Sequence, residues 1–175
     1  MSSPPLAKHV IIGTRDVSMA GVLAILSCRP ASASHSLVQN NLPGQQALQA
    51  TTLVDQDQQP IVSLIAINAP LTSAEQMNGC AFELASLLVS ATRVEIVGAS
   101  TSPVLRATLF HAVGVNGYAY QDIRQTPLEA HSQLAEPLLS SLLNFLGASG
   151  VPTSLYMTRG YRATGRPDDG TDKVG

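Results

Sequence analysis

The chain has 175 residues, of which 45% are apolar and only 13% are charged. Its net charge of −2 argues against nucleic-acid binding, because the 10 Lys and Arg residues are scattered rather than gathered into a basic surface. No apolar run approaches the about 20 residues needed to span a bilayer, and the beginning of the sequence lacks the apolar segment of a signal peptide. We therefore expect a protein of the cytoplasm or nucleus whose two cysteines stay reduced.

The first third of the chain predicts a strand, a helix and a hairpin. Residues 9–14 form a short apolar run typical of a strand, and Asp16 is placed to cap a helix over residues 17–28. Four apolar residues are expected to share the core-facing side of this helix: Met19, Val22, Leu23 and Leu26. Residues 46–54 and 61–68 have strand-forming sequences on either side of a polar loop, which indicates an antiparallel hairpin.

A second helix is predicted after the hairpin. Thr72 or Ser73 is placed to cap it, and it continues to about residue 91. Six of its residues are expected to face the core: Met77, Cys80, Ala81, Leu84, Leu87 and Leu88. Both cysteines, Cys28 and Cys80, lie in apolar helical surroundings, so both are expected to be buried as small hydrophobic side chains.

The region after this helix predicts one strand and then a long stretch without clear periodicity. Residues 93–99 have the composition of a buried strand, and the short polar loop 100–102 follows. Residues 103–113 fit either a short helix or an irregular segment, and the turn-rich residues 114–128 fit a surface loop.

An amphipathic helix, a turn and a strand are predicted over residues 134–160. Pro137 suits the first helical turn, because its missing N–H is not needed there. Four leucines recur at the spacing of a core-facing stripe: Leu139, Leu142, Leu143 and Leu146. Gly147 and Gly150 supply the permissive backbone that ends a helix, and residues 151–157 are rich in strand formers.

These elements predict an α/β fold with a mixed central β-sheet flanked by helices. Two passages run from helix to strand, at 73–99 and 137–158, and the hairpin adds antiparallel pairing. The expected organisation is a flexible lead-in over residues 1–7, a single domain over 8–160 and a polar, flexible tail over 161–175.

Loops at the carboxyl ends of strands are the places where such a fold gathers a site. Three loops qualify, at 13–16, 98–103 and 159–162. The first offers backbone N–H groups for an anion or a ribose, and equally fits a plain strand-to-helix turn that ends in a cap. In the second, three residues can form either a hydroxyl-rich nest for phosphate or a solvated turn: Ser100, Thr101 and Ser102. No P-loop lysine follows them, and the sequence contains no Gly-x-Ser-x-Gly elbow.

No residue pattern predicts catalysis or a metal site. The four histidines stand at no spacing that pairs them with a serine or cysteine nucleophile: His9, His35, His111 and His131. We expect His9 to be exposed before its strand and His111 to be partly buried. We also expect no catalytic residue, no metal and no cofactor, and therefore a protein that is not an enzyme.

Two segments resemble the proteasome assembly chaperone 1 family. Residues 93–106 contain VEIV followed by GASTSPVLRA, similar to the family's strand, Ser-rich turn and Pro-hydrophobic-Leu-Arg-Ala sequence. Residues 134–156 resemble its next segment, a leucine- and alanine-rich helix, a Gly-Val-Pro turn and an apolar strand that ends near a Tyr. The wider superfamily, which includes proteasome assembly chaperone 2 and archaeal relatives, shares this ending. The resemblance covers roughly residues 73–160.

The resemblance implies a single α/β domain related to the nucleoside-phosphorylase fold, without the active site of that enzyme. It also implies a chaperone that binds proteasome α-subunits during assembly of the α-ring, as a heterodimer with a second chaperone. The low charge density fits a chain whose surface is partly covered by a partner. Because Tyr and Arg in loops are the usual anchors of such contacts, five residues are candidates: Tyr118, Tyr120, Arg124, Tyr161 and Arg162.

Two further expectations follow. The family often ends in a hydrophobic-Tyr-X tail, whereas residues 172–175 contain no Tyr, so we do not expect docking of that kind. The alternative to a chaperone is a small nucleoside-phosphorylase- or hydrolase-like enzyme with its anion site at residues 100–102.

Overall fold

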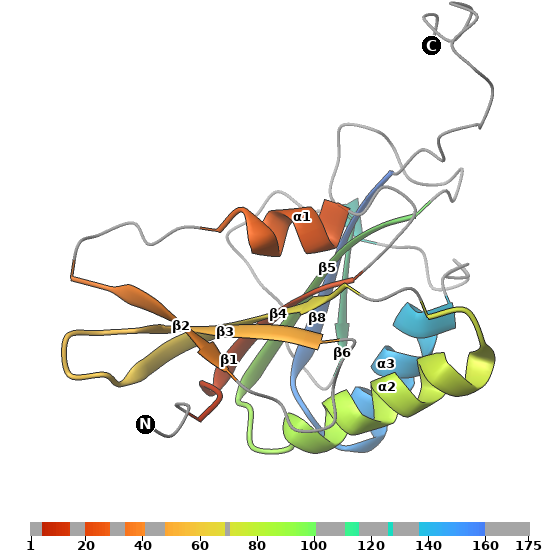
Figure 1. Cartoon of the computed structure of the whole chain (residues 1–175). Helices are drawn as coiled ribbons and strands as arrows, with labels where there is room; N and C mark the ends of the chain where they lie inside the picture. Colours follow the sequence, from red (N-terminus) through yellow and green to blue (C-terminus); the bar gives the residue numbers. More distant parts are fainter. Residues whose placement is uncertain are drawn as a thin grey trace, which may run out of the picture.

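One mixed β-sheet runs through the molecule, with helices on both of its faces (Figure 1). The computed structural model describes residues 5–14, 20–28, 34–40, 48–68, 71–100, 111–115, 126–127 and 137–159. Within these segments the elements in chain order are β1 (His9–Gly13), α1 (Ala20–Leu26), β2 (Ser36–Asn40), β3 (Leu48–Val54), β4 (Pro60–Ile67), α2 (Ala74–Leu87), β5 (Arg93–Ser100), β6 (His111–Val115), β7 (Thr126–Pro127), α3 (Pro137–Ala148) and β8 (Thr153–Arg159).

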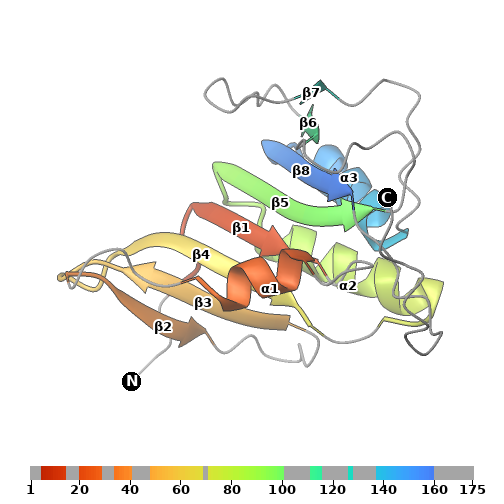
Figure 2. The ribbon, with the colours of Figure 1, turned by 90° about the horizontal axis from the view of Figure 1, so that it is seen from above.

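The strands of the sheet follow the order β2-β3-β4-β1-β5-β8-β6-β7 (Figure 2). The centre is parallel, because β1 pairs in parallel with both β4 and β5, and β5 pairs in parallel with β8. The flanks are antiparallel: β3 pairs with β4, β2 pairs with β3, and β6 pairs with β8. The prediction of a mixed sheet flanked by helices is therefore confirmed, and so is the predicted hairpin of β3 and β4.

The main hydrophobic core lies between the sheet and the helices α2 and α3. Four side chains form one row across the parallel strands, since the strand register aligns Ile65, Ile12, Ile96 and Leu155. From the helices, Leu84 and Leu142 join the same cluster with no exposed surface. Fully burying a side chain of this size contributes about 2 kcal/mol, so this layer supplies much of the stability of the fold.

Helix α2 begins where the sequence predicts it. Ser73 caps the helix by accepting a hydrogen bond from the backbone N–H of Gln76 at 3.1 Å, and the Gln76 side chain accepts in return from the N–H of Ser73 at 3.2 Å. Of the residues expected to face the core, Leu87 is 40% exposed, so the prediction is wrong there. Leu87 is partly exposed because of its position around the helix axis. It lies five residues from the exposed Phe82 and three from the buried Leu84, at the border between the exposed and the buried sides of the helix.

Helix α3 and strand β8 also match their predictions. Leu139, Leu142 and Leu146 are buried against the core. After the helix, Gly150 adopts a φ of 72°, a left-handed conformation that glycine enters without steric cost. The backbone N–H of Val151 then donates to the carbonyl of Leu146 at 3.1 Å, which closes the helix end and starts the chain toward β8.

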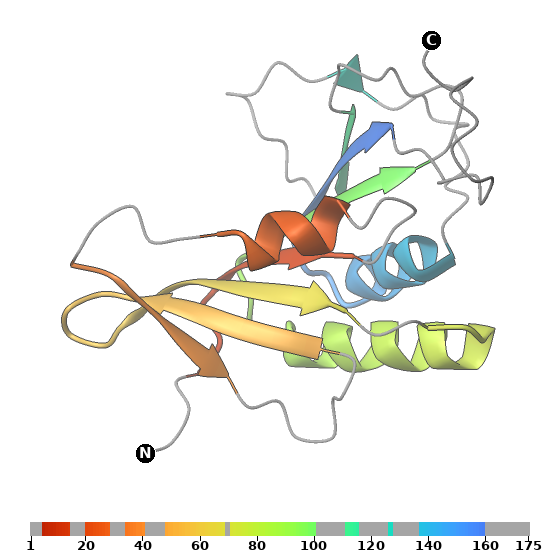
Figure 3. The same cartoon turned by 45° about the horizontal axis from the view of Figure 1, so that its top comes forward.

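Helix α1 lies on the opposite face of the sheet from α2 and α3 (Figures 1 and 3). It approaches the strands so closely that a Cβ on Gly21 would lie 2.2 Å from the carbonyl oxygen of Val97. A Cβ on Gly13 would likewise lie 2.1 Å from the carbonyl oxygen of Gly21. Two glycines therefore permit direct backbone contact between α1 and strands β1 and β5.

This glycine contact turns part of the predicted apolar side of α1 outward. Val22 is fully buried as expected, whereas Leu23 is 56% exposed and Leu26 is 36% exposed, so the prediction for the two leucines is wrong. Cys28, which follows the helix, is also exposed, whereas Cys80 is buried as predicted. The two leucines are exposed because the helix contacts the sheet through Gly21, a residue that has no side chain. Met19 lies outside the described residues.

A buried chain of hydrogen bonds holds the edge strand β2, which the sequence does not predict. The Oγ1 of Thr52 donates to Oδ1 of Asn40 at 2.7 Å, so its partner Ser63 must donate to it, also at 2.7 Å. The backbone N–H of Ala7 donates to Ser63 at 2.8 Å and completes the chain. The network thus links the segment before β1 to strands β4, β3 and β2 through buried polar side chains.

The region predicted as a helix or irregular segment and then a surface loop contains two strands. His111–Val115 forms β6, which pairs antiparallel with β8, and the two-residue β7 pairs with β6. The expectation of non-strand structure is wrong at these seven residues, because pairing of β6 with β8 and of β7 with β6 decides their conformation. In the described part of the chain, no helix is long and apolar enough to cross a membrane.

Candidate binding surfaces

The residues that sequence reasoning selects for partner binding lie outside the described part of the chain. This holds for Tyr118, Tyr120, Arg124, Tyr161 and Arg162, and for Thr101 and Ser102 of the alternative anion site. Ser100 is described only as the last residue of β5. These assignments therefore stay predictions, and the surfaces described below are formed by other residues.

The strand ends selected from the sequence do meet at one edge of the sheet. The register of β1 against β5 sets Gly13 beside Val97, and that of β5 against β8 sets Ser100 beside Arg159. Next to them, Thr14 is only 2% exposed, and its Oγ1 has no hydrogen-bond partner among the described residues. The backbone positions at which the three loops start therefore lie at one edge of the sheet, and a site formed by these loops stays a prediction.

A charged cluster forms at the opposite, amino-terminal ends of β1 and β5. The Nε2 of His9 lies 3.1 Å from Oε2 of Glu95, and Arg93 donates from Nε to Oε1 of the same carboxylate at 3.1 Å. His9 is therefore a partner of a carboxylate with 31% of its side chain exposed, and the prediction of an exposed histidine is wrong. Sequence inspection misses the contact because His9 and Glu95 are 86 residues apart and meet only through the parallel register.

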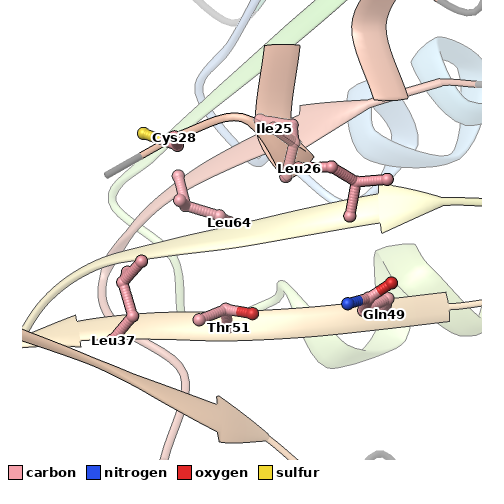
Figure 4. Close-up of a pocket in the computed structure, with 7 residues that line it drawn as sticks. All are labelled: Ile25, Leu26, Cys28, Leu37, Gln49, Thr51 and Leu64. Carbon is pink, nitrogen blue, oxygen red and sulfur yellow. The ribbon is translucent and has the colours of Figure 1, made fainter. Parts of the chain in front are cut away.

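A depression with both apolar and polar lining residues opens on the α1 face, between the end of α1 and the strands β2, β3 and β4 (Figure 4). Its volume is about 170 Å³. It is lined by Ile25, Leu26, Cys28, Leu37, Gln49, Thr51 and Leu64. Gln49 and Thr51 supply polar groups, so the lining is mixed and does not select one class of ligand.

An apolar surface lies on the side of α2 that faces away from the sheet. We call it the outer α2 face, and it consists of Glu75, Gly79, Phe82, Ser86 and Val89. These residues recur at helical spacing on one side of α2 and its first following turn. Phe82 is 57% exposed and Val89 is 64% exposed, the two largest exposures of large apolar side chains among the described residues.

Two contacts fix the shape of the outer α2 face. The ring of Phe82 meets the ring of Phe145 from α3 edge to face, with centroids 5.6 Å apart. The hydroxyl of Ser86 donates to the carbonyl of Phe82 at 2.9 Å, so it is bonded within its own helix and presents little polarity outward. The sequence signal for this face is an aromatic residue on the polar side of an amphipathic helix.

The buried cysteine is chemically quiet. Burial, and to a lesser extent the nearby Glu83 carboxylate, together raise the pKa of the Cys80 thiol from 9.0 to about 11. The thiol therefore stays protonated at neutral pH and is not a nucleophile there. Among the described residues, no three His, Cys, Asp and Glu side chains come together as a group that could hold a metal.

Comparison with known proteins relates the chain to solved structures rather than to sequences. The sequence matches no protein-family model and no curated protein sequence. The fold is similar to that of Pyrococcus furiosus PbaA, an archaeal homolog of proteasome-assembly chaperone, with a TM-score of 0.59 and 14% identity over 92% of this chain and 72% of that one. It is also similar to that of a Corynebacterium glutamicum protein of unknown function, with a TM-score of 0.59 and 15% identity over 89% of this chain and 68% of that one.

A third solved structure shares the same architecture. This is Pyrococcus furiosus PbaB, an archaeal proteasome activator, with a TM-score of 0.61 and 10% identity over 91% of this chain and 78% of that one. At such low identities the likeness concerns the fold. The chain therefore shares its α/β fold with an archaeal homolog of proteasome-assembly chaperone and with an archaeal proteasome activator.

Proposed function

We propose that this protein is a non-catalytic chaperone that assists assembly of the proteasome α-ring. The observation that carries the proposal is the fold shared with PbaA across 92% of the chain. A second, independent support is the sequence resemblance of residues 93–106 and 134–156 to the proteasome assembly chaperone 1 family. These residues include parts of β5, α3 and β8, which build the centre of the sheet and the core behind it.

In this proposal the protein acts by surface complementarity. It binds proteasome α-subunits as a heterodimer with a second chaperone and holds them until neighbouring subunits join. The candidate anchors in loops are Tyr118, Tyr120, Arg124, Tyr161 and Arg162, whose amphipathic side chains suit an interface that forms and releases. Apolar surface of the kind found on α2 suits the same role.

The alternative is a nucleoside-phosphorylase- or hydrolase-like enzyme with an anion site at Ser100, Thr101 and Ser102. Calorimetry with inorganic phosphate and with a nucleoside distinguishes it from a chaperone. Heat of binding at millimolar ligand, abolished by a Ser100→Ala, Ser102→Ala double variant, supports an anion site. The chaperone proposal predicts no heat.

The proposed function is tested by purifying an affinity-tagged copy from its own cells and identifying the recovered proteins by mass spectrometry. The proposal predicts proteasome α-subunits together with one further chaperone-sized protein of similar abundance. A tagged chain that is folded and expressed but recovers no α-subunit contradicts the proposal. A second tag placed at the other terminus controls for a blocked surface.

A further inference from the structure

We propose that the buried chain of hydrogen bonds from Ala7 to Asn40 sets the register of the edge strand β2, and through it decides which side chain of β2 lines the depression on the opposite face of the sheet. This role is independent of the proposed function. Three features support it: the weak register signal in β2 itself, the single direction in which the hydrogen bonds run, and the position of Asn40 in the strand.

The hydrophobic pattern of β2 selects its register only weakly. Among the strands that the structure describes, β2 pairs with β3 alone, at one end of the sheet. Its apolar residues, Leu37 and Val38, are consecutive, so they point to opposite faces, and both are half-buried. Neither face of the strand therefore carries a row of apolar side chains that a slip would expose, which is the usual means of fixing a register.

The connection from β2 to β3 is longer than a tight hairpin turn. A turn of two residues fixes the register of the strands that it joins, whereas β2 and β3 are joined by residues 41–47. In the next hairpin, by contrast, Oδ1 of Asp55 accepts from the backbone N–H groups of Asp57 at 2.9 Å and Gln59 at 2.8 Å, so the turn itself aligns β3 with β4. A longer connection is compatible with several registers, so side chains within the sheet are needed to select one.

The hydrogen bonds of the buried chain run in one direction. The backbone N–H of Ala7 can only donate, and it donates to Oγ of Ser63 at 2.8 Å. Thr52 gives its single hydroxyl proton to Oδ1 of Asn40 at 2.7 Å, so Ser63 gives its own proton to Thr52, also at 2.7 Å. Both hydroxyl protons are thus committed, and the place at the β2 end of the chain must hold an acceptor.

Asn40 supplies this acceptor, and it is the one buried residue of β2. In the observed register Asn40 lies opposite Ala50, and Val38 lies opposite Thr52. A slip of one residue would turn Asn40 to the other face. A slip of two residues would bring an apolar residue, Val38 or Leu42, to the place of Asn40, and the buried proton of Thr52 would lose the acceptor there. Leaving a buried donor unsatisfied shifts an equilibrium by about 10- to 100-fold, which is enough to select one register.

The same register places Leu37 in the wall of the depression (Figure 4). Leu37 and Asn40 are three residues apart in one strand, so their side chains point to opposite faces of the sheet. On the α1 face, Leu37 lines the depression together with Gln49 and Thr51 of β3. Any slip of β2 would bring a different side chain to this place. The polar chain on one face therefore shapes the depression on the other.

The test is the register of β2 in the full chain, read by NMR from cross-strand contacts between backbone protons. The wild type is expected to give one set of resonances for residues 36–40, with Val38 opposite Thr52. The double variant Asn40→Leu, Thr52→Val removes the acceptor and the donor at the β2 end of the chain. It is expected to give a second set for the same residues, with cross-strand contacts shifted by one or two residues and a population of at least about one tenth. Strands β5 and β8 are expected to give one set in both proteins.

The matched control is Gln39→Leu, Thr51→Val, which makes the same two substitutions at directly paired positions on the other face of β2 and β3. It is expected to keep one set of resonances. An Asn40→Leu, Thr52→Val variant that keeps only the wild-type register overturns the proposal, and so does a wild type that already shows two registers. A strand β2 that separates from β3 also overturns it, because the chain would then hold the strand without selecting its register. If the double variant does not fold, Asn40→Leu alone is judged by the same outcomes, because it changes only the edge strand.

Discussion

The contact between α1 and the sheet predicts opposite effects for the same substitution at two helical glycines. In Gly21→Ala, the new Cβ would lie 2.2 Å from the carbonyl oxygen of Val97, whereas ordinary contacts begin at 3.4 Å. Helix α1 must therefore move away from β5 by about 1 Å, and overpacking of this kind costs about 1–3 kcal/mol. The better helix propensity of alanine returns at most about 1 kcal/mol.

The expected net result for Gly21→Ala is a loss of about 1–2 kcal/mol in the free energy of unfolding. For a chain of this size the melting temperature should fall by about 2–8 °C. Gly79→Ala has the same chemistry without the clash, and should gain up to about 1 kcal/mol. Urea unfolding followed by far-UV circular dichroism measures both, and hydrogen exchange in α1 shows whether that helix detaches first. A Gly21→Ala variant as stable as Gly79→Ala would refute the close backbone contact.

Three further predictions concern buried and paired groups. When a thiol reagent is added to the folded protein at pH 8, Cys28 should react at once and Cys80 only after unfolding. Because the pKa of Cys80 is raised from 9.0 to about 11, the free energy of unfolding should fall as the pH rises through that range, and a Cys80→Ala variant should lose this dependence. Thr52→Val should cost about 2 kcal/mol in urea unfolding because it breaks a buried hydrogen-bond chain, whereas Thr51→Val, on the other face of the same strand, should change stability by less than about 0.5 kcal/mol. Glu95→Gln should lower the free energy of unfolding by about 1 kcal/mol, and this loss should shrink in high salt. No change at low salt would contradict a contribution from the contacts of Glu95 with His9 and Arg93.

The two long helices and the central strands could be predicted because local and tertiary signals agree in them. Ser73 and Gln76 predict the start of α2, because together they form the capping box that the structure contains. The leucines of α3 recur at helical spacing, and three of the four are fully buried. The continuous apolar run of β1 suits a strand covered on both faces.

The remaining elements could not be predicted because their determinants are not local. Helix α1 contacts the sheet through Gly21, which gives no hydrophobic signal in the sequence. Its leucines Leu23 and Leu26 are exposed, although apolar residues of an amphipathic helix normally face the core. Strand β2 is short and polar, and its buried Asn40 is satisfied only by Thr52 on a neighbouring strand. Strand β6 takes its conformation from pairing with β8, about 40 residues away in the sequence.

The candidate binding residues divide in the same way into those that the sequence indicates and those that it does not. Sequence reasoning selected loop tyrosines and arginines as anchors, which lie outside the described residues, and passed over Phe82 because it belongs to a predicted helix. A helical wheel places Phe82 opposite Leu84 and Leu88, on the side that an amphipathic helix normally keeps polar. An exposed aromatic residue at that position, next to a glycine, was the signal that could have revealed the surface.

A chaperone that assists α-ring assembly, as proposed, must bind α-subunits before the proteasome is complete, and the composition of its complexes shows whether it does. Complexes recovered through the tagged chain are separated by size on a native gradient, and the α- and β-subunits in each fraction are quantified by mass spectrometry. We expect the tagged chain to comigrate with α-subunits in fractions smaller than the mature particle, with β-subunits depleted there. Recovery of α- and β-subunits in equal amounts, or of neither, would contradict it.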